Sequence, residues 1–187
     1  MTTTTVPATL AGTYTIDPTH SRIGFVARHA MVTKVRGSFN EFDGSGYFDA
    51  GNPANSRLAL TIQAASIDTR NADRDAHLKS NDFFDMVNYA EITFTSTAVE
   101  QVDAENYRVI GDLTIKGVTR PVTVDFEYTG TAVDPFGNTR IGFEGKTTVN
   151  RKDWGVSWNA ALEAGGVLVS EKVLLEFEVS AIRTDAG

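Results

Sequence analysis

The segment SIDTRNADRDAHLKSNDFFD, residues 66–85, is rich in charged and ionisable side chains. Twelve consecutive positions hold three aspartates, two arginines, a histidine and a lysine: Asp68, Asp73, Asp75, Arg70, Arg74, His77 and Lys79. Carboxylates, guanidinium groups and an imidazole at this spacing could form a catalytic centre, a metal site or a phosphate clamp. They could equally be the solvated face of a short helix.

The string NADRDAHLKS, which starts at Asn71, has the features of such a helix. Asn71 can cap the first turn, where Asp73 and Asp75 face the positive end of the helix dipole. Lys79 suits the last turn and lies four residues after Asp75, a spacing that supports an ion pair. Several of the charges therefore have a structural explanation.

Catalytic and metal-binding motifs are weak in the rest of the chain. The three histidines are His20, His29 and His77, and no two have the i, i+4 spacing of a helical metal site. The chain has no cysteine, which excludes disulfides, thiolate catalysis and cysteine-based metal centres. Its glycines form no phosphate-binding loop. We predict no catalytic residue, no metal site and no cofactor.

Most of the chain outside this segment alternates between apolar and polar residues, which is a period of two in hydrophobicity. In the stretch RPVTVDFEYTG one face is apolar and consists of Val122, Val124, Phe126 and Tyr128. About eight such runs alternate with polar turns, for example DPFGN at 134–138. The pattern predicts an all-β chain, either a barrel or a sandwich of about eight antiparallel strands.

The alternation breaks at two places. One is ARHAMVTKVRG, residues 27–37, where a short helix or loop is expected near a barrel mouth. The other is the helix that starts at Asn71. The sequence therefore predicts one or two short helices beside the strands.

Length and charge restrict the organisation and the partners. The 187 residues suit one domain, with a flexible Thr-rich tail over 1–12 and a single barrel domain over 13–184. A formal net charge of −7 argues against a nucleic-acid partner. No run of about 18 apolar residues and no signal-peptide pattern is present, so we expect no membrane insertion and a cytoplasmic location.

Alternation also predicts which side chains point into the barrel. These are Phe25, Leu60, Phe94, Phe126, Phe143 and Phe177. An eight-stranded barrel can be filled by its side chains or can keep space for one ligand, and the pattern alone favours a packed core. Trp154 and Trp158 could cover a barrel mouth or plug its end.

Several ordered stretches carry a resemblance to a known family. They are YTIDPTHSRIGFVARHAMVTKVRGSFNEFDG, SIDTRNADRDAHLKSNDFFDMVNYAEITFTS, GDLTIKGVTRPVTVDFEY and RIGFEGKTTVNRKDWGVSWN. Through them the chain resembles the YceI-like family, the polyisoprenoid-binding, lipocalin-like proteins, over nearly all of its expected domain. The resemblance implies an extended eight-stranded antiparallel barrel, lipocalin-like, with a helix beside it. It also implies an apolar tunnel for a long-chain amphiphile such as a polyprenyl quinone, a polyprenyl phosphate or a fatty amide.

The function implied by the resemblance is a non-catalytic lipid carrier that forms homodimers. Members are often exported, whereas MTTTTVPATLAG stands here in the place of a signal peptide, so a cytoplasmic carrier is expected. Alternatives are an enzyme acting on a lipid or small hydrophobic substrate, using His20 or His77 beside an aspartate, and a stress protein that sequesters hydrophobic compounds.

The same resemblance gives the candidate site residues a role. Ligand contacts are expected from the six inward-facing residues and from Trp158. Head-group contacts are expected from Arg70, Arg74 and His20. Alternatively the two arginines pair with nearby aspartates and fasten the helix to the barrel, which the carboxylates of the segment favour.

Overall fold

Antiparallel strands make up most of the chain, as the alternation predicts. The structure is a computed structural model, and it describes residues 6–160, 162 and 168–184. The strands are β1 (Gly12–Ile16), β2 (Arg22–His29), β3 (Thr33–Phe39), β4 (Phe42–Phe48), β5 (Arg57–Gln63), β6 (Ile67–Asp68), β7 (Glu91–Gln101), β8 (Asn106–Ile115), β9 (Val118–Val133), β10 (Thr139–Asn150) and β11 (Lys172–Arg183). The α-helix is α1 (Ala72–Lys79), and short 3-10 turns are η1 (Ala8–Leu10), η2 (Pro18–His20), η3 (Pro53–Asn55), η4 (Ala64–Ser66) and η5 (Arg151–Trp154).

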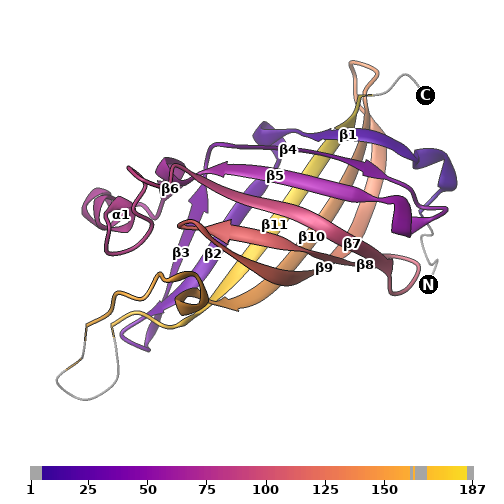
Figure 1. Ribbon diagram of the computed structural model, residues 1–187. Helices are drawn as coiled ribbons and strands as arrows, with labels where there is room; N and C mark the ends of the chain where they lie inside the picture. The colour runs from indigo at the N-terminus through magenta and orange to yellow at the C-terminus, as the bar shows by residue number, and fades with distance from the viewer. Residues whose placement is uncertain (1–5, 161, 163–167, 185–187) are drawn as a thin grey trace.

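Eight of these strands close into a barrel (Figure 1). The order is β1-β4-β5-β7-β8-β9-β10-β11, and β11 returns to pair with β1 through Ala181–Arg183. The other part of β11, Leu174–Glu178, pairs with β2, which continues the sheet through β3 to β6. The predicted eight-stranded antiparallel barrel with a helix beside it is confirmed.

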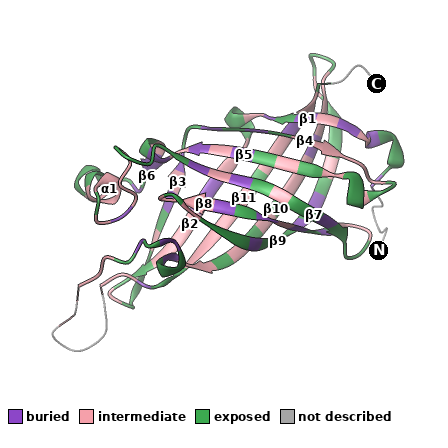
Figure 2. Ribbon diagram, in the orientation of Figure 1, coloured by how far each residue is buried: buried purple, intermediate pink, exposed green. Residues whose placement is uncertain are grey.

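Burial alternates along the strands (Figure 2). On β9 the residues Val122, Val124, Phe126 and Tyr128 are buried while their neighbours are exposed. The β8–β9 hairpin turns at Lys116 and Gly117, which both have positive φ, 52° and 74°. Two successive residues of this kind suit the right-handed twist of a tight hairpin.

The segment 27–37 differs from the expected helix or loop. It contains the end of β2, a turn and most of β3, and β2 pairs with β3 from Ile23↔Phe39 to His29↔Thr33. Ala30 and Met31 form the turn with positive φ. The alternation is interrupted because a turn of two left-handed residues joins the strands, and sequence pattern alone does not distinguish this from a loop.

The start of the described chain differs from the expected tail over residues 1–12. Val6 is 5% exposed and Leu10 is 8% exposed, so both belong to the core. The Tyr14 hydroxyl donates a hydrogen bond of 2.8 Å to the Leu10 carbonyl. Val6 and Leu10 therefore anchor this stretch to the core, and residues 1–5 lie outside the described residues.

The predicted helix is present as α1, beyond β3 and β6 at one end of the barrel (Figure 1). The Asn71 side chain caps it by accepting a 2.9 Å hydrogen bond from the Arg74 N–H. None of its residues is fully buried. The helix is therefore mainly a solvated surface, with Leu78 packed against the core.

Candidate functional site

The barrel interior contains two adjoining apolar cavities, each of about 140 Å³. One water molecule needs only roughly 10–15 Å³ of such space. We call them lobe 1, lined among others by Tyr14, Phe48, Tyr107, Phe126 and Phe143, and lobe 2, lined among others by Phe25, Phe39, Leu78, Phe84 and Trp154. Five residues line both lobes and are called the waist: Ile23, Leu60, Phe94, Val124 and Phe177.

Several inward-facing side chains are only partly buried. Phe25, Phe143 and Phe177 belong to this group although they point into the barrel. Because they line the lobes, part of the surface that they expose borders the cavities. The inward faces therefore leave two spaces unfilled, in contrast to the packed core that the alternation alone favours.

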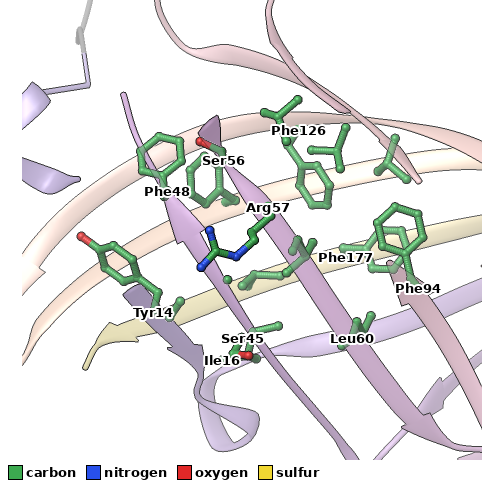
Figure 3. A pocket seen from close by; sticks show the side chains of 18 of the residues that line it. Tyr14, Ile16, Ser45, Phe48, Ser56, Arg57, Leu60, Phe94, Phe126 and Phe177 are labelled. Carbon is green, nitrogen blue, oxygen red and sulfur yellow. The ribbon is translucent and has the colours of Figure 1, made fainter. Parts of the chain in front are cut away.

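Lobe 1 extends to a polar rim beside β4 and β5. Its lining includes the exposed residues Ser45 and Arg57 together with half-buried Ser56. The Arg57 guanidinium lies over the Tyr47 ring, 5.4 Å from its centroid. Figure 3 shows Arg57 and Ser56 in the same part of the pocket as Phe48, with Leu60 and Phe94 farther along. A ligand in lobe 1 can therefore keep a polar group near water.

Lobe 2 ends against the region of α1. Leu78 of the helix and Phe83 and Phe84 of the following turn line it. Trp154 closes the wall and donates a hydrogen bond of 2.9 Å from its indole N–H to the Leu113 carbonyl. This end is thus more apolar than the rim of lobe 1.

The six residues predicted to point inward all line the cavities. Phe126 and Phe143 line lobe 1, Phe25 lines lobe 2, and Leu60, Phe94 and Phe177 belong to the waist. The prediction of their orientation is confirmed. Their contact with a ligand stays a prediction.

Trp158 occupies a different position from the one expected. It lines neither lobe; its ring packs edge-on against His77 at 4.6 Å between centroids and lies 5.3 Å from Phe83. Trp158 therefore contacts Phe83, which lines lobe 2, but does not line the lobe itself. A direct ligand contact would require this cluster to open.

The charged candidates also lie outside the cavity lining. Arg70 is exposed, and its positive φ of 65° places it in the link before α1. Arg74 donates from Nε to the Thr69 hydroxyl at 2.7 Å and from a terminal nitrogen to the Thr69 carbonyl at 2.6 Å. The Thr69 hydroxyl in turn donates to Asp75 at 2.5 Å. The expected arginine–aspartate pairing is thus replaced at Arg74 by a threonine-mediated link.

Neither histidine–aspartate pair faces the cavities. His20 Nδ1 lies 2.8 Å from Asp17, and His77 Nε2 lies 2.8 Å from Asp82. The imidazoles are 67% and 39% exposed, and neither lines a lobe. Within the described residues no group of three histidines and carboxylates could hold a metal ion.

Several residues of the site were not predicted from the sequence, among them Tyr107, Phe48 and Arg151. Tyr107 and Phe48 lie at strand ends, where an adjacent turn shortens the alternating run. Tyr107 nevertheless shares a face with Val109, which is a signal that could have found it. Arg151 opens η5, where no period of two exists to reveal its burial.

Comparison with known proteins identifies the family. The family model of the YceI-like domain matches residues 14–181. The chain belongs to the YceI-like family. A UPF0312 protein of Photorhabdus laumondii is 44% identical to this YceI-like chain over 147 residues, which is 78% of this chain and 76% of that protein.

Solved structures share the YceI-like barrel. BcnA of Burkholderia cenocepacia matches with a TM-score of 0.78 and 25% identity, over 88% of this chain and 98% of BcnA. A polyisoprenoid binding domain from Saccharophagus degradans, implicated in plant cell wall breakdown, matches with a TM-score of 0.69 over 91% of this chain and 98% of that domain. Its identity of 16% shows a common fold alone.

One buried cation holds the wall of lobe 2 in this YceI-like barrel. Arg151 is 7% exposed and donates from Nε to the Ser170 carbonyl at 2.9 Å. One terminal nitrogen donates to the carbonyls of Val156 and Trp158 at 2.6 and 2.9 Å, and the other to Val169 at 3.3 Å. Burial lowers the pKa of Arg151. The guanidinium therefore ties the chain after η5 to the chain before β11.

A second charged network lies on the outside of the barrel. Arg140 donates to Asp17 at 2.7 Å and to Asp134 at 2.8 Å. The Arg140 guanidinium holds the pKa of Asp17 well below its usual range. Burial raises the pKa of Asp134, but the Asn138 N–H and Arg140 outweigh it and keep the pKa at about 2.

This network predicts a pH dependence of stability. The two carboxylates have folded-state pKa values below their ordinary value of 3.8, so they stabilise the fold above that pH. We expect the free energy of unfolding to fall as the pH decreases from about 4 to about 2. Arg140→Leu should make this decrease shallower, because both carboxylates lose their cation.

Urea denaturation over this pH range measures the effect. Arg108→Leu is the matched control, since Arg108 forms an exposed pair with Asp125 at 3.3 Å and should leave the wild-type slope unchanged. An Arg140→Leu variant with the wild-type slope would contradict the assigned network.

Within the described part of the chain, no helix has the length and apolar character required to span a bilayer.

The candidate site consists of the two lobes, the waist and the polar rim. This site can bind a ligand by burying its apolar surface and by forming a few hydrogen bonds.

Proposed function

We propose that the protein binds a long-chain amphiphile, such as an isoprenoid lipid or isoprenoid quinone, and carries it with the chain inside the barrel. The observation that carries the proposal is the pair of adjoining apolar lobes in a closed barrel. Each buried CH₂ contributes about 0.8 kcal/mol, so burial of the chain supplies affinity without any reaction. The description of the Saccharophagus degradans domain as polyisoprenoid binding supports the same ligand class.

The difference between the lobes suggests an orientation for this ligand. A polar head group needs water or hydrogen-bond partners, which Ser45, Ser56 and Arg57 offer at the rim of lobe 1. The chain then runs toward lobe 2, where Phe83 and Trp154 offer apolar surface. A long chain must pass the waist, so Leu60 and Phe94 are contacts of every long ligand.

Native mass spectrometry of freshly purified protein tests the proposal. We expect a population of the protein that is heavier by the mass of one long-chain molecule, and we expect extraction with organic solvent to remove this molecule. Delipidated protein should then take up farnesol or geranylgeraniol. Protein that carries no such molecule and takes up neither alcohol would contradict the proposed function.

Phe143→Ala tests whether the Phe143 ring borders a ligand space or belongs to an ordinary packed core. In a packed core such a change costs roughly 3–5 kcal/mol of stability. We expect a clearly smaller loss in delipidated protein, because the ring already borders lobe 1, together with weaker binding of a fluorescent polyprenyl probe.

Ile67→Ala is the control for Phe143→Ala. Ile67 is 4% exposed and lines neither lobe, so it should show a full core cost of roughly 2–5 kcal/mol with unchanged probe affinity. A large stability loss with unchanged probe affinity in Phe143→Ala would assign Phe143 to the ordinary core.

The non-catalytic role belongs to the same proposal. An enzyme of this fold would need a base near its substrate, whereas His20 and His77 lie outside both lobes. A protein that sequesters hydrophobic compounds under stress would use the same lobes. Its affinity would vary little with ligand shape, whereas a carrier selects one ligand class.

We further propose that the protein is a homodimer in the cytoplasm. Among the described residues, the outer edge of β3 pairs only at Ser38 and Phe39, which leaves the rest of that edge open to a second copy. Met31 and Val32 beside it are 55% and 74% exposed. Sedimentation velocity at micromolar concentration should show a dimer, and a monomer would contradict this part of the proposal.

A further inference from the structure

One polar group inside the barrel has no partner among the described residues. Tyr107 is 2% exposed and lines lobe 1, and its hydroxyl makes no hydrogen bond there. Buried polar groups are almost always hydrogen-bonded, and an unmet hydroxyl costs roughly 1–3 kcal/mol. The hydroxyl can therefore donate a hydrogen bond to an acceptor that enters lobe 1.

The surroundings of Tyr107 hold its ring in place. The ring packs edge-on against Phe48 at 5.5 Å and Phe143 at 6.1 Å between centroids. Its backbone lies in β8, paired with Gln101 of β7 and Phe126 of β9. The side chain is thus fixed on the inner wall and is not free to turn toward water.

We propose that Tyr107 donates a hydrogen bond to a neutral oxygen of the bound amphiphile, such as a ketone, quinone or amide carbonyl, inside lobe 1. This inference rests on the proposed function and narrows its ligand class to long chains that carry such an oxygen. It also fixes the orientation: the oxygen lies in lobe 1 and the chain passes the waist into lobe 2.

Electrostatics favour a neutral acceptor. Burial raises the pKa of Tyr107, so the phenol stays protonated and can donate at neutral pH. The cation that lines lobe 1 is Arg57, which lies exposed at the rim, and an anionic group deep in the lobe would lose its hydration without a counter-ion.

The buried cation of lobe 2 is a weaker anchor. Arg151 already donates four hydrogen bonds to backbone carbonyls, which leaves at most one of its five N–H groups for a ligand. Tyr107, in contrast, has its only donor unused. A ligand oxygen therefore gains more in lobe 1.

The test compares two probes on delipidated protein: farnesylacetone, an isoprenoid ketone, and the hydrocarbon of the same carbon skeleton without the oxygen. Tyr107→Phe should weaken ketone binding about five- to tenfold and leave hydrocarbon binding unchanged. The stability of the delipidated variant should equal or exceed that of the wild type, because an unmet hydroxyl has been removed.

Tyr128→Phe is the matched control. Tyr128 is 4% exposed and packs 5.9 Å from Phe143, but it does not line lobe 1. Both probes should bind this variant as they bind the wild type.

The outcomes separate the inference from the proposed function. Equal ketone affinity in wild type and Tyr107→Phe, or an equal loss for both probes, would overturn the role of Tyr107 while chain binding stands. A wild-type protein that binds neither probe would overturn both.

Discussion

Arg151→Met is expected to lower the free energy of unfolding by about 3–5 kcal/mol, measured by urea denaturation. The Met side chain fills a similar volume but donates no hydrogen bond. The carbonyls of Val156, Trp158, Val169 and Ser170 would lose their donor, and each buried unmet carbonyl costs roughly 1–3 kcal/mol before the chain relaxes.

Two controls define the cause of this loss. Arg151→Lys keeps a positive charge but lacks the planar guanidinium with its fixed set of donors, so it should lose nearly as much stability. Lys152→Met removes only an exposed pair with Glu171 at 2.7 Å and should change stability by less than about 1 kcal/mol. Wild-type stability in Arg151→Met would show that the guanidinium does not hold the wall of lobe 2.

Leu60→Trp is expected to abolish the advantage of long ligands over short ones. Leu60 lines both lobes, and an indole at this position should fill the waist and block passage of a chain. Affinity for a geranylgeranyl chain should fall about a hundredfold, to the level of a geranyl chain, because only one lobe remains accessible. Affinity for the geranyl chain should change little.

The neighbouring Ala59→Trp serves as the control. Ala59 lies on the same strand, is exposed and lines neither lobe, so its ligand affinities should equal those of the wild type. Denaturation of both variants checks the fold, since overpacking typically costs about 1–3 kcal/mol. A folded Leu60→Trp protein that still prefers the longest chain would show that ligands do not pass the waist.

Local rules explain how much of the barrel could be predicted. The alternation of β9 depends on adjacent residues facing opposite sides, and the Asn71 cap depends on atoms three residues apart, so both are visible in sequence. The same rule placed Phe126 and Phe177 on the inner wall.

Other features depend on contacts between distant segments. Val6 and Leu10 are buried because the barrel offers them an apolar surface, although their own stretch looks like a tail. Arg151 is buried because its donors meet carbonyls from two later segments. The lobes themselves result from the curvature of the closed sheet, which sets the distance between the inner faces. This curvature cannot be predicted from the sequence of any single strand.

The contacts of Arg74 also could not be predicted from the sequence. Charge composition suggested pairs between Arg74 and a nearby aspartate, whereas the turn before α1 brings the hydroxyl and carbonyl of Thr69 to its guanidinium. Composition identifies which charges are available, but backbone geometry decides which atoms meet.

A chain-length series on delipidated wild-type protein shows directly whether the barrel holds a long chain. Geranyl, farnesyl and geranylgeranyl ketones, each one isoprene unit longer than the last, are titrated by displacement of a fluorescent probe. After the cost of ordering the chain, the net gain of a drug-sized ligand is about 0.3 kcal/mol per heavy atom, so each five-carbon unit predicts about tenfold tighter binding. Affinities that do not rise with chain length, or no binding of any member, would contradict a barrel that holds a long chain.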